Sequence, residues 1–276
     1  MRVSSLVVVG VDGSRWSDAA VVQAAREAAW RRARLHLVHV VPRPVSAVGV
    51  PSLDLAPLRR LTRQAAALAQ EAAPGIEVSE TVEAGATVPV LAREARGAGL
   101  VVTGSRGMGG FTGMLLGSTA ESLSAHSECP VMVVRGDTEH AGPVVLGADG
   151  SRSGEWAVEF AFAEAALRGA GLVAVHAWSP EGKAPERRDE EAAERLLTRV
   201  VASRRERYPE VAVTREVVRG EPRQTLIGAS AAAQLVVVGA RGGGGFLRQL
   251  LGSVSKALLH HAHCPVAVVR NPRASG

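Results

Sequence analysis

Two glycine-rich segments of the chain have the residue types and the spacing that suit phosphate binding. The spacing Gly-x2-Gly-x9-Gly-Ser occurs twice, as Gly104-x2-Gly107-x9-Gly117-Ser118 and as Gly239-x2-Gly242-x9-Gly252-Ser253. Glycine lets the backbone approach a ligand without a Cβ in the way, and the amides of such a loop form an anion-binding concavity. If Ser118 and Ser253 open helices, free amides and the positive end of a helix dipole face the same anion.

A carboxylate accompanies each glycine-rich segment. Asp12-Gly13-Ser14 follows one short apolar run and Asp149-Gly150-Ser151 follows another. Each carboxylate can accept ribose hydroxyls or help hold a divalent metal bound to phosphates. Arg106 and Arg241 can add a charged donor, or equally stay in solvent. The alternative interpretation is structural, because glycine-rich loops are turns and Asp-Gly-Ser caps a helix that follows a strand.

The chain repeats itself over about half its length. Val7–Val41 aligns with Val144–Trp178 without gaps, at 18 identical positions of 35, and Leu100–Arg135 aligns with Leu235–Arg270, at 21 of 36. A repeat of about 136 residues is far too long for a solenoid unit. The sequence therefore predicts a duplicated domain.

The stretch between the two copies reads as a linker. Gly, Asp, Thr and Pro punctuate residues 136–143, and such residues mark turns and loops. We place the first domain at residues 1–136, the linker at 137–142 and the second domain at 143–272.

Short apolar runs alternate with longer helical patterns within each copy. The runs are four to seven residues long and rich in β-branched residues, which suits buried parallel strands. The predicted strands are Leu6–Val11, Leu35–Val41, Ile76–Val82, Leu100–Thr103, Val131–Val134, Val144–Ala148, Leu172–His176, Val211–Val217, Leu235–Val238 and Val266–Val269. The predicted helices of the first copy are Asp18–Ala33, Leu58–Ala72, Val88–Ala98 and Thr119–Ser127.

This alternation predicts an α/β fold with two tandem, doubly wound, five-stranded parallel-sheet domains of the Rossmann-like type. With strand order 3-2-1-4-5, the topological switch point lies between the first and fourth strands of each domain. Ligands bind outside the carboxyl ends of the strands at that point. The aspartates and the glycine-rich loops converge there.

The compound glycine spacing resembles the ATP-binding signature of universal stress proteins. Asp12-Gly13-Ser14, His39-Val40 and Cys129-Pro130-Val131 are similar to the same family, and the resemblance covers essentially both halves. It implies that ATP, with Mg²⁺ on its phosphates, is the ligand. It further implies that Asp12 and Asp149 contact the ribose side, that the backbone at Val40 or Ala177 meets the adenine edge, and that the glycines with Ser118 and Ser253 hold the phosphates. The implied nucleotide-binding set is Asp12, Gly13, Ser14, Val40, Gly104, Arg106, Gly107, Gly117, Ser118, Asp149, Gly150, Ser151, Ala177, Gly239, Arg241, Gly242, Gly252 and Ser253.

The resemblance also bears on assembly. The last strands, Val131–Val134 and Val266–Val269, form domain-pairing edges in similar proteins, so we expect the two halves to pair within the chain, with a homodimer as an option. The two copies differ in detail: Gly85 lies in a stretch without the proline of Pro222, and the 42–57 loop differs from 179–188. These differences bear on whether the two sites bind equally.

The composition bears on which classes of partner and which cellular compartment suit the protein. The 276 residues are 46% hydrophobic and 21% charged, and the formal net charge is +5. Arginine supplies nearly all of the positive charges. The arginines are scattered and no aromatic residues interleave with them, which argues against nucleic acid. No stretch reaches the ~18 apolar residues of a membrane span. Two cysteines make no disulfide framework, and both precede Pro and are expected to pack as buried hydrophobes. We expect a cytoplasmic protein.

Catalytic and metal-binding patterns are weak. His260-His261-Ala262-His263-Cys264 reads as a helix end rather than a metal cluster, and we expect no metal held by side chains alone. His39 and His176 read as satisfied sheet-edge histidines more readily than as general bases. No Gly-Lys-Ser/Thr occurs, which disfavours fast ATP turnover. The resemblance, together with the missing catalytic patterns, implies a non-catalytic, ATP-binding stress-response regulator. The alternatives are a slow ATP hydrolase or adenylyl-transferring enzyme, and an interaction scaffold with vestigial sites.

Overall fold

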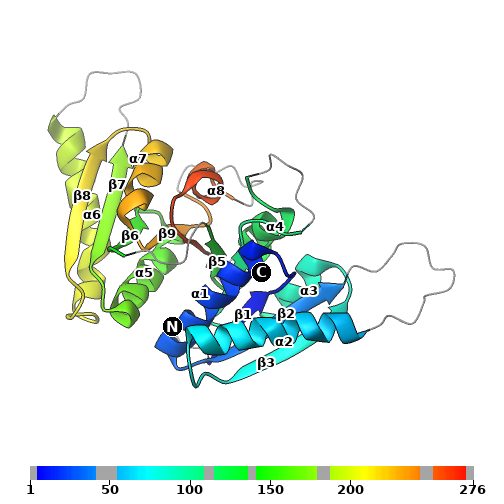
Figure 1. The fold of residues 1–276 in the computed structure, drawn as a ribbon. Coiled ribbons are helices and arrows are strands. Elements are labelled where there is room, and N and C mark those ends of the chain that lie inside the picture. Colours follow the sequence, from blue (N-terminus) through cyan, green and yellow to red (C-terminus); the bar gives the residue numbers. More distant parts are fainter. Residues whose placement is uncertain are drawn as a thin grey trace. The chain divides into compact units, whose positions relative to one another are not determined.

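The computed structural model describes residues 5–41, 55–108, 115–135, 141–178, 187–242 and 251–271. The chain divides into two compact units (Figure 1), Met1–Leu123 with Ser127–Val134, and Ser124–His126 with Arg135–Gly276. Of the predicted linker 137–142, only residues 141 and 142 are among the described residues. The loop 42–57 falls largely outside them, as does all of 179–188 apart from the backbone of the last two residues.

The first unit is a five-stranded parallel sheet with helices between the strands. Its strand order is β3-β2-β1-β4-β5. The strands are β1 (Leu6–Gly10), β2 (Arg34–Val41), β3 (Val78–Ala84), β4 (Leu100–Gly104) and β5 (Val131–Val134). The helices are α1 (Arg15–Arg31), α2 (Leu55–Ala72), α3 (Thr87–Glu94) and α4 (Ser118–His126).

The second unit repeats this plan with the order β8-β7-β6-β9-β10, also parallel throughout. The strands are β6 (Val144–Gly147), β7 (Leu172–Trp178), β8 (Val213–Arg219), β9 (Leu235–Gly239) and β10 (Val266–Val269). The helices are α5 (Glu155–Arg168), α6 (Arg187–Arg205), α7 (Pro222–Ala229) and α8 (Ser253–His261), with short 3₁₀ helices η1 (Arg152–Gly154) and η2 (Ser230–Ala232). The predicted fold class and strand order are confirmed.

Helices cover both faces of each sheet, which explains the unbroken apolar strands. Val7, Val8 and Val9 of β1 have no exposed surface, because a doubly wound sheet is buried on both sides. Small residues line the face of α1 that packs on the sheet, and Ala20, Ala24 and Ala28 are also fully buried. Their short side chains let the helix backbone approach the sheet.

The switch point lies where the sequence predicts it. In the first unit β1 pairs with β2 on one side and β4 on the other, and in the second β6 lies between β7 and β9. The chain therefore leaves the carboxyl ends of β1 and β4 toward opposite faces, which opens a crevice between them. Among the described residues, no helix is long and apolar enough to cross a membrane.

Candidate functional site

The turn after β1 is built around Asp12. Its Oδ1 accepts a hydrogen bond from the amide of Ser14 at 3.0 Å, and Ser14 Oγ accepts one from the amide of Ser17 at 3.2 Å. Ser14 is the N-cap of α1. Gly13 has φ +81°, and a Cβ there would lie 2.9 Å from Leu61 Cδ1. The Asp-Gly-Ser sequence thus forms the turn and caps the helix, and it holds the Asp12 carboxylate in place.

The second unit builds the same turn. Asp149 Oδ1 accepts hydrogen bonds from the amide of Ser151 at 3.0 Å and from its hydroxyl at 2.7 Å. Ser151 Oγ accepts from the amide of Gly154 at 3.1 Å, capping η1. Gly150 has φ +72°, the left-handed conformation that glycine adopts without strain.

The loop after β4 closes onto the same carboxylate. Asp12 Oδ2 accepts a hydrogen bond from the amide of Met108 at 3.0 Å. A Cβ at Gly107 would lie 2.5 Å from this oxygen, and one at Gly104 would lie 2.6 Å from the carbonyl oxygen of Trp16. In the second unit a Cβ at Gly242 would lie 2.7 Å from Asp149 Oδ2. The close approach of the loop to the aspartate thus favours glycine at positions 107 and 242, and the close approach to the Trp16 carbonyl favours it at position 104.

The last glycine of each motif begins a helix. Gly117 is the N-cap of α4 and Gly252 the N-cap of α8, and neither helix has a side-chain cap. The amide of Gly117 donates to the carbonyl of Ser105 at 2.7 Å, and that of Gly252 to the carbonyl of Ala240 at 2.8 Å. The Gly117 amide is therefore not the free donor that the sequence suggested, because the loop itself uses it. The helix starts remain open to a ligand without a side-chain cap.

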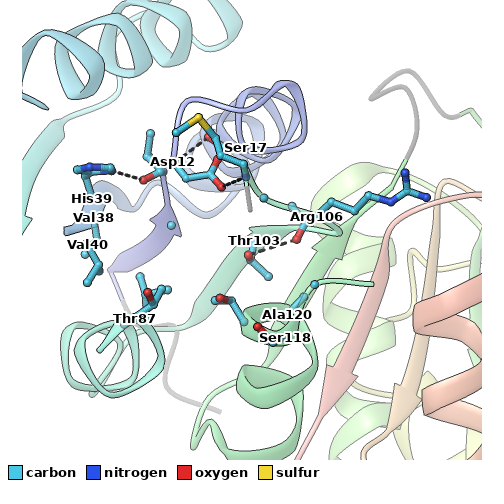
Figure 2. Close-up of a pocket in the computed structure, with 18 of the residues that line it drawn as sticks. Asp12, Ser17, Val38, His39, Val40, Thr87, Thr103, Arg106, Ser118 and Ala120 are labelled. Atoms are coloured by element: carbon cyan, nitrogen blue, oxygen red, sulfur yellow. Dashed lines mark hydrogen bonds between the residues drawn. The ribbon is translucent and has the colours of Figure 1, made fainter. Parts of the chain in front are cut away.

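A cavity of about 490 Å³ lies beside these elements in the first unit (Figure 2). It brings together seven of the predicted residues, Asp12, Val40, Gly104, Arg106, Gly107, Gly117 and Ser118. Gly13 and Ser14 are not in its lining, because they form the turn and the helix cap. Its size falls within the ~300–1,000 Å³ of small-molecule sites.

The matching cavity of the second unit measures about 370 Å³. It too brings together seven predicted residues, Asp149, Ala177, Gly239, Arg241, Gly242, Gly252 and Ser253. Gly150 and Ser151 line a separate cavity of about 240 Å³ beside α5 and α6. The duplicated motif therefore forms the same kind of pocket twice.

Comparison with known proteins identifies the family. The family model described as the universal stress protein family matches residues 5–135 and again residues 141–270. The chain belongs to the universal stress protein family. A universal stress protein of Mycolicibacterium smegmatis is 40% identical over 283 residues, which cover 96% of each chain. One from Mycobacterium tuberculosis is 42% identical over 287 residues, again covering 96% of each.

A solved structure has the same fold along the whole chain. The universal stress protein of Archaeoglobus fulgidus superimposes with a TM-score of 0.73 at 19% identity, covering 97% of this chain and 99% of that one. The fold of the two tandem domains is thus found in a solved structure of low sequence identity. Membership places the chain among stress-response proteins.

The arginine of the first motif, Arg106, has a defined position in this universal stress protein. Arg106 borders the cavity, but its guanidinium lies 5.5 Å from the centroid of the Trp16 ring. Figure 2 shows its side chain extending away from Asp12 and Thr87. A cation over an aromatic face is stabilised by the ring quadrupole.

The strand-end histidines have the same partner in both domains. His39 Nδ1 lies 2.7 Å from the carbonyl oxygen of Val11, and His176 Nδ1 lies 2.7 Å from that of Ala148. A carbonyl oxygen accepts only, so each Nδ1 carries a proton. Each imidazole thus donates its Nδ1 proton to the backbone carbonyl just before the aspartate turn, which is a structural role.

Several residues that line the first pocket were not predicted from the sequence. Thr87 and Leu91 come from α3, Thr103 from β4 and Thr119 from α4. No local pattern marks them, although Thr103 and Thr119 stand next to the predicted Gly104 and Ser118. Among the described residues, no group of three or more His, Cys, Asp or Glu side chains is placed to hold a metal ion.

Proposed function

We propose that this universal stress protein binds an adenine nucleotide, ATP with Mg²⁺, in one pocket per domain, and acts as a nucleotide-dependent regulator rather than as an enzyme. The adenine would lie toward the β2 end at Val40, the ribose beside Asp12, and the phosphates at the start of α4. The same assignment applies to Ala177, Asp149 and α8 in the second domain.

The observation that carries the proposal is the glycine at each helix start. Gly117 has φ −77°, which any residue can adopt, and a Cβ there would meet nothing nearer than Arg106 Cα at 3.5 Å. At Gly252 the nearest atoms would lie 3.6 Å away. Both values are ordinary van der Waals contacts, so packing does not demand glycine at either position. A ligand that comes close to the backbone accounts for the glycine in both copies.

The chemistry of the helix start favours an anion. An α-helix that begins without a side-chain cap presents its first amides and the positive end of its dipole. Ser118 and Ser253 add a hydroxyl at the first helical position of α4 and α8. Phosphate is one of the anions that such helix starts bind.

The residues present suit Mg²⁺ that arrives with the nucleotide. Mg²⁺ is usually held by substrate phosphates and one or two carboxylates rather than by an all-protein cage. Asp12 lines the first pocket and Asp149 the second. In each pocket the aspartate could supply one oxygen ligand to Mg²⁺, while the phosphates of the nucleotide supply others.

The test is calorimetric titration of the full chain with ATP and Mg²⁺, comparing the parent with G117A/G252A. A methyl group placed in the path of a phosphate overpacks the site by about 1–3 kcal/mol, so we expect affinity to fall about tenfold or more. Unfolding without ligand should change by less than about 1 kcal/mol, because the lost N-cap preference and the reduced chain entropy offset each other.

G228A is the matched control. Gly228 lies in α7, and a Cβ there would have nothing within 4 Å. It should leave binding unchanged. Absence of binding of ATP, ADP and AMP to the parent would refute the proposal, and release of ADP or AMP within minutes would favour the enzymatic alternative.

A further inference from the structure

The two pockets differ in their capacity for hydrogen bonds. Thr87, Thr103 and Thr119 line the first pocket, and the residues at the same positions of the second are Pro222, Val238 and Val254. Figure 2 shows Thr87, Thr103 and Ser118 around one common space, from α3, β4 and α4. Three hydroxyls of the first pocket are therefore missing from the second.

At one position the second pocket has a hydroxyl that the first lacks, but it does not make up for the three missing ones. Ala120 in the first pocket corresponds to Ser255 in the second. Ser255 Oγ lies 3.2 Å from the carbonyl oxygen of Ala240 and 3.0 Å from that of Gly252, and can donate its proton to either. Its hydroxyl is thus engaged by the glycine-rich loop.

Thr103 is the most informative of the three hydroxyls. It is 7% exposed, and among the described residues its Oγ donates only to the carbonyl of Gly104 at 3.4 Å. An O–H···O bond has its usual length at about 2.7–2.8 Å, so this one is weak. A buried hydroxyl that is poorly paired destabilises the fold. Val238, at the same place in β9, is 4% exposed. Its side chain has the same shape as that of threonine but carries no hydroxyl that needs a partner.

Unlike that of Thr103, the hydroxyls of Thr87 and Thr119 have no hydrogen-bond partner within the described part of the chain. Both residues are half-buried at helix starts, Thr87 on α3 and Thr119 on α4. Three hydroxyls around one cavity, none of them well paired by the protein, are suited to a ligand rich in hydrogen-bonding groups.

A second difference concerns charge. Helix α3 begins after Ala86 without a side-chain cap. At the matching start of α7, Glu221 accepts a hydrogen bond from the amide of Gln224 at 3.1 Å, and Pro222 occupies the first turn. Burial works to raise the pKa of Glu221, but hydrogen bonds from Arg223 and from backbone amides outweigh it and keep the pKa below its ordinary value. The helix start that the first domain leaves uncapped is thus occupied in the second by a carboxylate, which is paired with Arg223 at 2.7 Å.

We propose that the pockets form a high-affinity and a low-affinity site: the first binds a polyphosphate nucleotide at least about tenfold more tightly than the second, through Thr87, Thr103 and Thr119. This inference rests on the proposed function. Tenfold is a modest demand, since one hydrogen bond contributes about 0.5–1.5 kcal/mol and 1.4 kcal/mol is tenfold in Kd. The protein then responds to nucleotide in two steps, one domain loading before the other.

The experiment is calorimetric titration of the full chain with ATP and Mg²⁺, on the parent, T103V and V238T. We expect two phases in the parent. T103V should weaken the tight phase about tenfold, and V238T should strengthen the weak phase by a similar factor. T62V is the matched control, because Thr62 is 1% exposed, lies in α2 and bonds to the carbonyl of Arg59 away from the pocket.

Tryptophan fluorescence assigns the phases to domains. Trp16 lies beside the loop of the first pocket, whereas Ser153 occupies its place in the second unit. The fluorescence change of the tight phase should disappear in W16F while the heat of binding remains.

The outcomes separate the inference from the proposed function. Two equal sites in the parent overturn the inference and leave nucleotide binding standing, whereas no binding at all overturns both. If T103V fails to fold, V238T decides alone, and unchanged affinity of the weak phase in V238T contradicts the inference.

Discussion

The carboxylate of Asp12 accepts a hydrogen bond from the backbone amide of Met108 at 3.0 Å, although the two residues are 96 positions apart. Its other oxygen accepts from Ser14. One side chain therefore ties the carboxyl end of β1 to the loop after β4, across the switch point. A ligand that binds Oδ2 of Asp12 shares that oxygen with the Met108 amide of the loop.

The first prediction concerns this tie. In D12A the amide of Met108 loses its charged acceptor, a bond that contributes about 1.5–3 kcal/mol. We expect amide exchange in residues 104–108 to accelerate by about 10–100-fold, measured by hydrogen exchange with mass spectrometry. E71A, an exposed acidic residue of α2, serves as control. Unchanged exchange at 104–108 in D12A would show that the contact does not hold the loop.

The second prediction tests the close approach at Gly104. A Cβ there would lie 2.6 Å from the backbone oxygen of Trp16, and a backbone atom cannot move aside cheaply. We expect G104A to lower the free energy of unfolding in urea by about 1–3 kcal/mol. G239A, its counterpart, should cost less because the nearest atom would be 3.1 Å away.

G228A is expected to change the free energy of unfolding in the opposite direction. Its Cβ would enter open space in α7, so we expect stabilisation of about 0.4–1 kcal/mol. Equal effects of G104A and G228A would contradict the packing argument.

The sequence predicted the strands well because their signal is local. The runs Val131–Val134 and Val266–Val269 are the strands β5 and β10 to the residue. Helix ends depend on caps instead. Helix α1 starts at Arg15, three residues before the predicted Asp18, because Ser14 caps it. The predicted helix Val88–Ala98 ends at Glu94, and Gly97 follows in the left-handed region at φ +75°.

The site was predictable only in part, because some of its residues follow strands directly while others reach it only through tertiary packing. Asp12 and Gly104 directly follow strands, so topology alone brings them together. Thr87 and Leu91 reach the pocket from α3, which packs over Gly10 so closely that a Cβ there would lie 3.2 Å from Leu91. That contact is tertiary, and no local pattern encodes it.

The third prediction concerns a buried ion pair that recurs in both domains. Arg168 Nε lies 3.1 Å from Glu164 Oε2, with side chains 3% and 0% exposed, and Arg31 and Glu27 form the same pair in the first domain. R168M removes this cation from a buried carboxylate, so we expect a loss of about 3–5 kcal/mol in urea unfolding.

The matched control is R195M. Arg195 and Glu191 have the same four-residue spacing on α6, but their side chains are 60% and 51% exposed. An exposed pair contributes at most about 1 kcal/mol. Similar losses for R168M and R195M would rule out burial as the cause.

The fourth prediction is a loss of stability at high pH that depends on Cys264. Burial raises the pKa of the Cys264 thiol from 9.0 to about 12, and its side chain is fully buried, as its place before Pro265 suggested. Above pH 9 the unfolded chain releases this proton while the folded chain keeps it. The folded state therefore binds more protons, and stability falls as pH rises from about 9 to 12.

The expected size follows from about 1.4 kcal/mol per unit of pH above the unfolded pKa. Between pH 7 and pH 10 the parent should lose about 1.4 kcal/mol more than C264A, measured by urea unfolding at both values. C264A removes the thiol and leaves a small cavity, so it starts from a lower stability at pH 7 and the comparison is between slopes. Parallel slopes for the parent and C264A would mean that the thiol ionises equally in the folded and unfolded chains, and would contradict this prediction.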